Sequence, residues 1–223
     1  MIRYRKLASS TYCALPTTDF NLVYNVGMTS QDDSQQSQDS VMTLIEEDRQ
    51  EILYFAYGSN LSTAQMRQRC PYSMPIGLGF LPGWRWTINE RGFANAVQLP
   101  ASSTGTDHRS VAGQPVRAAA EGIYGLLYLL PPGDEAALDS HEGVPWAYEK
   151  YQCDVWWIKD DKGMEQDSMV RALVYIDVQR VGEGAPREEY VDRMERAIED
   201  AVDNWGMDED YADVAMRRFW PRA

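Results

Sequence analysis

The sequence has few of the residues from which disulfide frameworks and metal centres are built. It contains three cysteines, Cys13, Cys70 and Cys153, an odd number without a repeated spacing, and this is a poor basis for a disulfide framework. Its two histidines, His108 and His141, have no C-x-x-C or H-x-x-x-H neighbour, so we do not expect a zinc site. The low cysteine content indicates a reducing compartment.

Long apolar runs and excess positive charge are also missing. No stretch approaches the ~18 apolar residues of a membrane span. The formal net charge of −13 repels phosphate backbones and anionic lipids, which argues against nucleic-acid and membrane partners. The 223 residues, of which 44% are hydrophobic, suffice for one domain with a substantial core, together with a tail.

The first 50 residues differ in composition from the rest. Residues 30–40 consist of Ser, Gln and Asp and cannot bury apolar surface, so we predict that residues 1–50 form a disordered N-terminal extension. Residues 1–18 carry basic but no acidic side chains, as in a transit peptide to the mitochondrion. We favour the simpler interpretation of an extension or a mis-set start, because Met28 and Met42 could also initiate the chain.

Residues 51–223 read as a domain of class α+β, with apolar periodicities of both strand and helix type. Strands are predicted at 52–57, 76–80, 84–88, 93–99, 122–130, 148–157 and 169–178, and helices at 62–70, 131–143, 186–205 and 208–219. Ser62 and Gln65 have the spacing of a capping box, and residues 100–120, rich in Ser, Gly, Thr and Ala, are expected to form a long surface loop. Because most strands follow one another through short turns, the sheet should be mixed and close into a small β-barrel with flanking helices.

Two segments could carry chemistry. Gly58, Ser59 and Asn60 follow the first strand and precede a helix, where backbone N–H groups can bind a carboxylate or an oxyanion, although ordinary loops often look the same. Glu142 lies at the end of a short predicted helix, where the helix dipole opposes its charge. Such local conflicts tend to occur at functional sites, whereas an isolated Glu more often simply faces solvent. His141 should point away from Glu142 and is interpreted as structural.

Together these segments resemble the γ-glutamylcyclotransferase family. Its signature is similar to Tyr54-Phe55-Ala56-Tyr57-Gly58-Ser59-Asn60-Leu61, and its catalytic segment is similar to Glu142-Gly143-Val144, before Tyr148. Tyr175 matches a late substrate-contacting tyrosine of the family. The glutathione-specific branch has a hydrophobic residue where Asn60 stands, so this chain looks closer to the γ-glutamyl amino acid branch.

The resemblance implies an enzyme that converts γ-glutamyl amino acids to 5-oxoproline by internal aminolysis and needs no cofactor. Glu142 would be the catalytic general acid/base. The implied substrate-binding residues are Tyr54, Phe55, Ala56, Tyr57, Gly58, Ser59, Asn60, Tyr148 and Tyr175. The four tyrosines among them could provide an apolar surround for Glu142 as well as hydrogen bonds, and Tyr54 is the one most easily explained by core packing alone.

Other interpretations stay open at this point. One is a γ-glutamylamine cyclotransferase acting on γ-glutamyl-ε-lysine, and another is a non-catalytic stress-response binding protein of the same fold. A third is an acidic interaction protein in which residues 188–200 form only a solvated face. We expect a small-molecule γ-glutamyl substrate and a cytoplasmic location, or a mitochondrial one if residues 1–18 are a transit peptide; homodimer formation is left open.

The composition of the N-terminal extension generates a first prediction. A chain that starts at Met42 should keep the melting temperature and the activity of the full chain, because the removed residues cannot contribute to a packed core. Thermal melts and turnover assays of both chains test this. A large drop in either quantity would show that the extension docks on the domain.

Overall fold

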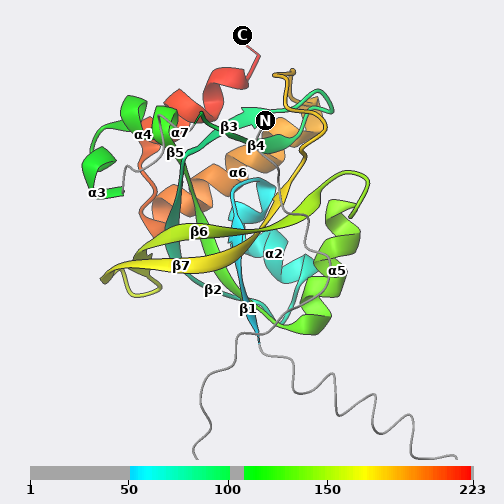
Figure 1. Cartoon of the computed structure of the whole chain (residues 1–223), viewed down its shortest axis with the longest axis horizontal. Helices are drawn as coiled ribbons and strands as arrows, with labels where there is room; N and C mark the ends of the chain where they lie inside the picture. Colours follow the sequence, from blue (N-terminus) through cyan, green and yellow to red (C-terminus); the bar gives the residue numbers. More distant parts are fainter. Residues whose placement is uncertain (1–50, 101–107, 222–223) are drawn as a thin grey trace, which may run out of the picture. The chain divides into compact units, whose positions relative to one another are not determined.

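The computed structural model describes residues 51–100 and 108–221 (Figure 1). They belong to a unit that spans Gln50–Ala223 and is separate from a unit at Met1–Arg49. The predicted extension at residues 1–50 lies outside the described residues and stays a prediction. Within them no helix is both long enough and apolar enough to cross a bilayer.

Five strands close into a barrel, as the sequence predicted. Their order around the barrel is β1 (Ile52–Ala56), β5 (Gly122–Leu130), β2 (Met74–Pro82), β6 (Glu149–Asp160) and β7 (Glu165–Ile176). Neighbouring strands pair antiparallel except β1 and β7, which pair in parallel where Tyr54 meets Leu173. β5 is buried along nearly its whole length, in agreement with the apolar side chains on both of its faces.

The aromatic ring of Phe55 packs closely against two glycines inside the barrel. Phe55 is fully buried, and its ring lies against Gly79 and Gly125 on the facing strands, which pair with each other. A Cβ atom on Gly125 would lie 2.4 Å from the carbonyl oxygen of Ala56 and 2.5 Å from the Phe55 ring. The two glycines therefore provide the space that this phenylalanine occupies.

A small second sheet covers the loop that follows β1. It consists of β3 (Trp84–Ile88) and β4 (Ala94–Gln98), which pair antiparallel with each other. The buried Trp86 donates a hydrogen bond from Nε1 to the carbonyl oxygen of Tyr57 (2.9 Å). This bond fixes the end of β1 to the small sheet.

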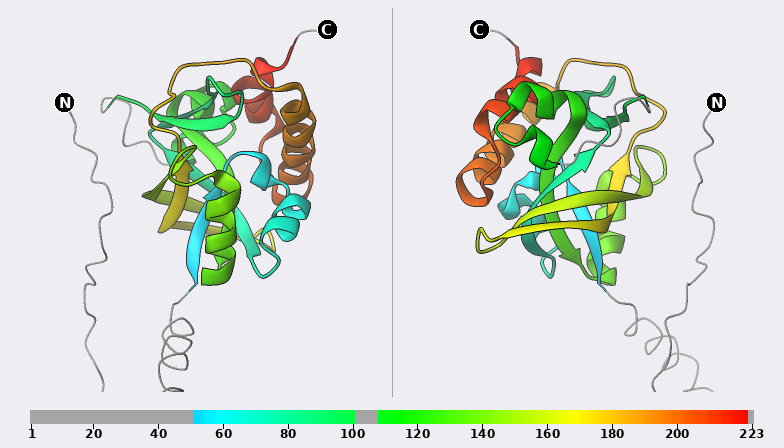
Figure 2. Two further views of the ribbon diagram at one scale, coloured as in Figure 1. Left: turned by 90° about the vertical axis from the view of Figure 1, so that its right-hand side faces the viewer. Right: turned by 60° about the vertical axis from the view of Figure 1, so that its left-hand side comes forward.

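The remaining elements are helices that pack around the barrel (Figure 2). Outside residues 108–121 they are η1 (Ser59–Leu61), α2 (Thr63–Arg69), α5 (Pro132–Glu142), α6 (Glu188–Trp205), α7 (Glu209–Ala215) and η3 (Arg217–Phe219). As predicted, Gly143 ends α5 in the left-handed conformation (φ 66°) and the side chain of Asp208 caps α7. The five buried residues of α6 face the core, and the other side of the helix is charged.

The prediction of a long loop over residues 100–120 is wrong for its described part. Residues 108–121 form α3 (His108–Val111) and α4 (Pro115–Glu121), while 101–107 lie outside the described residues. Proline at the first helical position and three consecutive alanines favour α4, and its buried Ala118 lies on the side that meets α7. The small polar residues earlier in the segment concealed this helical pattern.

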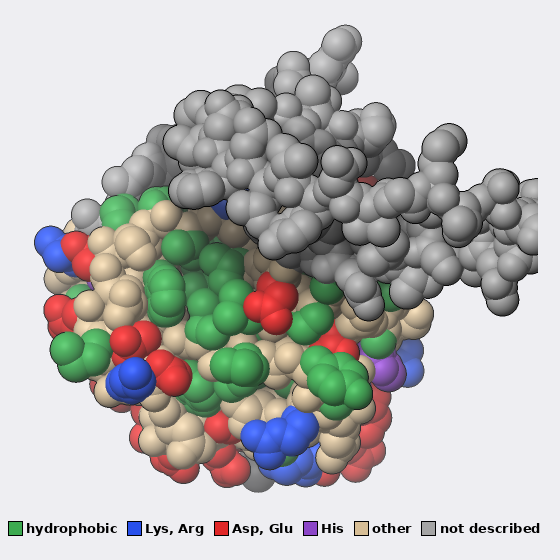
Figure 3. Space-filling view, turned by 90° about the horizontal axis from the view of Figure 1, so that it is seen from below, with side chains coloured by type: hydrophobic (Ala, Val, Ile, Leu, Met, Phe, Trp, Pro, Cys, Tyr) green, Lys and Arg blue, Asp and Glu red, His purple; other side chains and the backbone are tan. Residues whose placement is uncertain are grey.

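The face of the molecule seen from below combines apolar and charged side chains. Apolar side chains gather in its middle, with acidic and basic ones around them (Figure 3). Large apolar side chains that are exposed in the described residues include Tyr72, Met74, Met164 and Met169. Homodimer formation nevertheless stays a prediction.

The barrel packing predicts a different effect for two glycine substitutions. Gly125→Ala should lower the free energy of unfolding by about 1–3 kcal/mol, because the added methyl group overfills the barrel. Gly133→Ala is the matched control, since a Cβ there meets nothing within 4 Å and should be neutral or slightly stabilising. Denaturant melts of both variants measure the difference, and equal stabilities would contradict the packing argument.

Candidate active site

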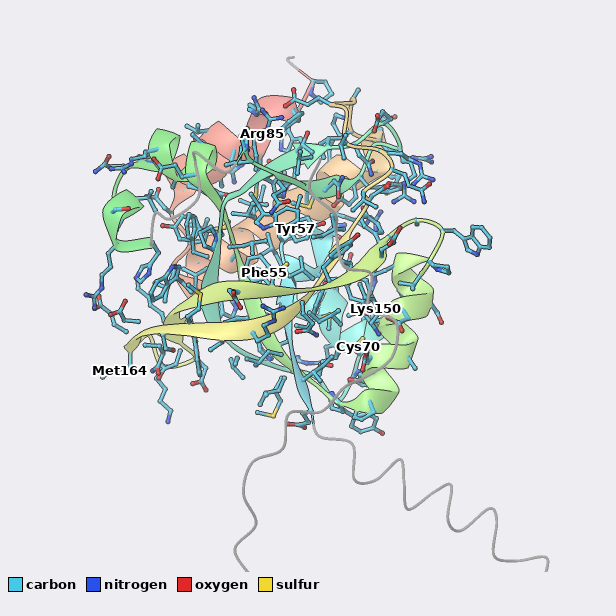
Figure 4. The ribbon with its side chains drawn as sticks, viewed as in Figure 1. Phe55, Tyr57, Cys70, Arg85, Lys150 and Met164 are labelled. Atoms are coloured by element: carbon cyan, nitrogen blue, oxygen red, sulfur yellow. The ribbon has the colours of Figure 1, made fainter. Side chains whose placement is uncertain are left out.

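Glu142 is the last residue of α5, and the helix is tied to the barrel on two sides. The Lys150 ammonium of β6 contacts Glu135 and lies 3.0 Å from Asp139 Oδ2. The Tyr175 hydroxyl of β7 donates to Asp139 Oδ1 (2.6 Å). Figure 4 shows Lys150 between β6 and α5 and Tyr57 near the end of β1. The C-terminal turn of α5, with its carboxylate, is therefore held in one place.

The side-chain amide of Asn60 links Glu142 to the loop after β1. Its Nδ2 donates to Glu142 Oε1 (2.9 Å) and to the Tyr54 hydroxyl (3.0 Å). Its Oδ1 accepts from Gln65 Nε2 (3.0 Å) and from Arg69 Nη1 (3.0 Å). All four hydrogen-bonding positions of this buried amide are used, so its orientation is fixed.

The predicted capping box of α2 forms only in part. The Ser62 hydroxyl accepts from the Gln65 backbone N–H (3.2 Å), as expected for an N-cap. The Gln65 side chain does not return to Ser62; it donates to Ser59 Oγ (2.8 Å) and to Asn60. The start of α2 thus supports the candidate site in addition to capping its helix.

Burial is the main influence on the charge of Glu142. Its side chain is 17% exposed, and desolvation raises the pKa of the carboxyl above its ordinary value of 4.5. Arg69, with Nη1 3.7 Å from Oε1, opposes this shift, as do the Asn60 hydrogen bond and the more distant Arg91 and Arg193. A carboxyl with a raised pKa can hold and release a proton closer to neutral pH.

Three of the predicted tyrosines use their hydroxyl protons within the protein. Tyr57 donates to the carbonyl oxygen of Tyr175 (2.6 Å), Tyr148 to that of Ala94 (2.7 Å), and Tyr175 to Asp139. Their rings are buried. They therefore supply the apolar surround that the sequence suggested, while their hydroxyl groups fasten neighbouring segments.

The site opens into a cavity of about 270 Å³, close to the lower end of small-molecule pockets. The predicted residues that line it are Tyr54, Tyr57, Gly58, Ser59, Asn60, Glu142, Tyr148 and Tyr175. Phe55 and Ala56 are buried in the barrel core and are not among the lining residues, so their contact with a substrate stays a prediction. Tyr54 does more than pack, because its hydroxyl reaches Asn60. His141 is exposed and also lines the cavity, so it does not have the structural position expected for it.

Sequence reasoning missed the cationic residues of the cavity. Arg69, Arg91 and Arg193 line it together with Tyr190. They come from α2, the turn between β3 and β4, and α6, and no motif connects these segments. The one available signal was chemical, since a buried carboxylate requires a nearby cation or hydrogen-bond donor.

Metal-ligating side chains do not cluster among the described residues. These residues contain no group of three His, Cys, Asp or Glu side chains placed to hold a metal ion. A second hollow of about 410 Å³ is lined by His108, Asp167 and Tyr124. Its lining includes neither Glu142 nor the loop after β1.

A closed barrel of this order with flanking helices is the γ-glutamylcyclotransferase-like fold. Solved structures that this chain resembles include one described as γ-glutamyl cyclotransferase, with 19% identity and a TM-score of 0.55 over 77% of this chain and 89% of that chain. An uncharacterized human protein has 18% identity and a TM-score of 0.55, with 78% and 90% covered. YkqA from Bacillus subtilis has 19% identity and a TM-score of 0.55, with 82% and 60% covered.

These similarities confirm the predicted resemblance at the level of the fold. No family model matches the chain, and no curated protein matches it. At such low identity the shared fold does not identify a substrate, and the γ-glutamyl amino acid branch stays a prediction.

The environment of Glu142 predicts how its replacement changes stability with pH. Folding raises the pKa of Glu142, so its stabilising contribution is present below the unfolded pKa, near 4.5, and is lost as pH rises through the folded pKa. Glu142→Gln keeps an acceptor for Asn60 but carries no charge. The melting temperature of Glu142→Gln minus that of the parent protein should therefore increase as pH rises from 4 towards neutral.

Thermal melts across this pH range provide the measurement. The exposed Glu165→Gln is the control, and its difference from the parent should vary little over the same range. A constant difference for Glu142→Gln would contradict the raised pKa.

Proposed function

We propose that residues 51–223 form a γ-glutamylcyclotransferase domain that converts γ-glutamyl amino acids to 5-oxoproline and the free amino acid. The observation that carries the proposal is the partly buried Glu142 carboxylate in a small cavity, hydrogen-bonded to Asn60 of the loop after β1. A single carboxylate in an apolar surround is what internal aminolysis requires. A pure binding protein has no need of it.

The reaction joins two groups that are already in one molecule. The α-amino nitrogen of the γ-glutamyl unit attacks its γ-carbonyl carbon, a five-membered lactam forms, and the bond to the departing amine breaks. Because nucleophile and electrophile are tethered, the protein mainly selects the reactive conformer. Glu142 accepts a proton from the attacking nitrogen and delivers it to the departing nitrogen, a role suited to a carboxyl with a raised pKa.

The loop after β1 is proposed to hold the γ-glutamyl unit. Backbone donors of Tyr57, Gly58 and Ser59 would bind its α-carboxylate or the oxyanion of the tetrahedral intermediate. A Cβ atom on Gly58 would lie 3.2 Å from the Tyr190 hydroxyl oxygen and 3.4 Å from Ala94 Cβ, so a side chain there would narrow the cavity. Tyr54 accepts from Asn60, which leaves its own hydroxyl proton for a substrate oxygen.

Two other functions remain to be distinguished by experiment. A γ-glutamylamine cyclotransferase would use the same carboxylate on γ-glutamyl-ε-lysine, and a non-catalytic stress-response protein would bind without turnover. Incubation with γ-glutamyl amino acids, glutathione and γ-glutamyl-ε-lysine, with detection of 5-oxoproline, separates the three. Release from none of these substrates would overturn the proposal. A cytoplasmic location also stays a prediction.

The proposed proton transfer predicts the activity of the Glu142→Gln variant. The amide preserves size and the hydrogen bond from Asn60 but cannot exchange the proton, so kcat should fall by about 10²–10⁴. Steady-state release of 5-oxoproline from the best substrate of the panel measures this. Glu165→Gln is again the control and should keep parental turnover. Near-normal turnover by folded Glu142→Gln would remove Glu142 from the mechanism.

A further inference from the structure

Arg91 stands in the turn between β3 and β4 and lines the cavity. The turn lies beside the chain that leaves β7 (Figure 1), and buried hydrogen bonds join the two. Asn89 Oδ1 accepts from the backbone N–H groups of Arg91 (3.0 Å) and Phe93 (3.3 Å), and Asn89 Nδ2 donates to Asp177 Oδ2 (3.0 Å). The backbone of Arg91 is thereby fixed at the cavity wall.

The guanidinium group of Arg91 lies over two aromatic rings, and its Nε and Nη2 donors are unused within the described part of the chain. It lies 4.8 Å from the centre of the Tyr148 ring and 5.7 Å from that of Phe93. Its Nε is 3.3 Å from Asp177 Oδ2, an ion pair without the alignment of a hydrogen bond. Neither Nε nor Nη2 has a hydrogen-bond acceptor among the described residues, although a guanidinium offers five donors.

Neutralising Asp177 does not require Arg91. Oδ2 of this buried carboxylate already accepts from Arg180 Nη1 (2.8 Å) and from Asn89. Its Oδ1 accepts from the backbone N–H groups of Gln179 (3.2 Å) and Arg180 (3.1 Å). Both the charge and the lone pairs of Asp177 are satisfied without Arg91, so a structural role alone does not explain a partly buried arginine at this place.

The other two cationic side chains of the cavity are engaged more fully. Arg69 donates to Asn60, and Arg193 donates through Nε and Nη2 to Glu189 Oε2 (3.2 and 3.0 Å). Arg91 is therefore the cation best able to accept a new anionic partner. Arginine binds carboxylates with particular strength, because its planar fork can form two parallel hydrogen bonds.

A γ-glutamyl amino acid carries two carboxylates. The proposed function assigns the α-carboxylate of the γ-glutamyl unit to the loop after β1, and a second carboxylate belongs to the departing amino acid. Arg91 and Glu142 line the same cavity, and the charge of Arg91 acts on the Glu142 carboxyl by lowering its pKa, so both groups face the space proposed for the departing amino acid.

We propose that Arg91 binds the carboxylate of the departing amino acid and so makes the site selective for γ-glutamyl α-amino acids over γ-glutamyl amides without that group. This inference rests on the proposed function. It names a specificity residue for the departing group, which lies outside the segments that carry the family resemblance.

The test uses two substrates that differ only in this carboxylate, γ-glutamyl-alanine and γ-glutamyl-ethylamide. The parent protein should prefer γ-glutamyl-alanine. Arg91→Met should lower kcat/KM for γ-glutamyl-alanine by about 10- to 100-fold, the usual worth of charged hydrogen bonds. It should change kcat/KM for the ethylamide far less. Arg91→Lys keeps the charge but loses the planar fork of the guanidinium group. Its kcat/KM for γ-glutamyl-alanine should lie between those of the parent protein and Arg91→Met.

Arg180→Met is the matched control, because it also removes a cation from Asp177 but Arg180 does not line the cavity. It should affect both substrates equally. Equal losses with both substrates in Arg91→Met, or no preference in the parent protein, would overturn the assignment while leaving the proposed function intact. Failure of the parent protein to release 5-oxoproline from either substrate would instead overturn the proposed function. If Arg91→Met does not fold, the substrate ratio of Arg91→Lys decides in its place.

Discussion

The candidate site depends on one interaction, the hydrogen bond between the Asn60 amide and the partly buried carboxylate of Glu142. A buried carboxylate at the C-terminus of a helix is unfavourable twice, through desolvation and through the helix dipole. The Asn60 amide and the Arg69 guanidinium offset part of this cost, and each also contacts the other. The loop after β1, the start of α2 and the end of α5 must therefore keep their relative positions for the carboxylate to be stable in its place.

The barrel provides this constraint because both sides of the interaction are anchored on it. The loop that holds Asn60 continues from β1, which is fully paired with β5, and the hydroxyl of Tyr128 on β5 donates to the Asn60 carbonyl oxygen (3.0 Å). Glu142 depends on α5, which Lys150 and Tyr175 attach to β6 and β7. The parallel pairing of β1 with β7 joins the strand that precedes the Asn60 loop to one of the two strands that hold α5.

The sequence predicted the parts of this arrangement that depend on local order. Period-two and period-four patterns located the strands and most helices, and the Gly58 and Glu142 segments were recognised by their local chemistry. Contacts between distant segments left no such signal: Arg69, Arg91 and Arg193 are isolated cations until the fold brings them to one cavity. The resemblance assigned Phe55 to substrate binding as part of the signature segment, but it carried no information on packing, and the Phe55 ring fills the space left by Gly79 and Gly125.

The distribution of hydroxyl protons limits the chemistry that the cavity can support. Tyr57, Tyr148 and Tyr175 donate to protein oxygens, and burial raises the pKa of each, with the Asp139 carboxylate adding to the shift of Tyr175. These tyrosines therefore stay neutral and are poorly placed to exchange protons with a ligand. Proton transfer in the proposed function is therefore assigned to Glu142 and not to these tyrosines. An internal aminolysis, in which the same proton acceptor serves the attacking and the departing nitrogen, needs no second acid or base.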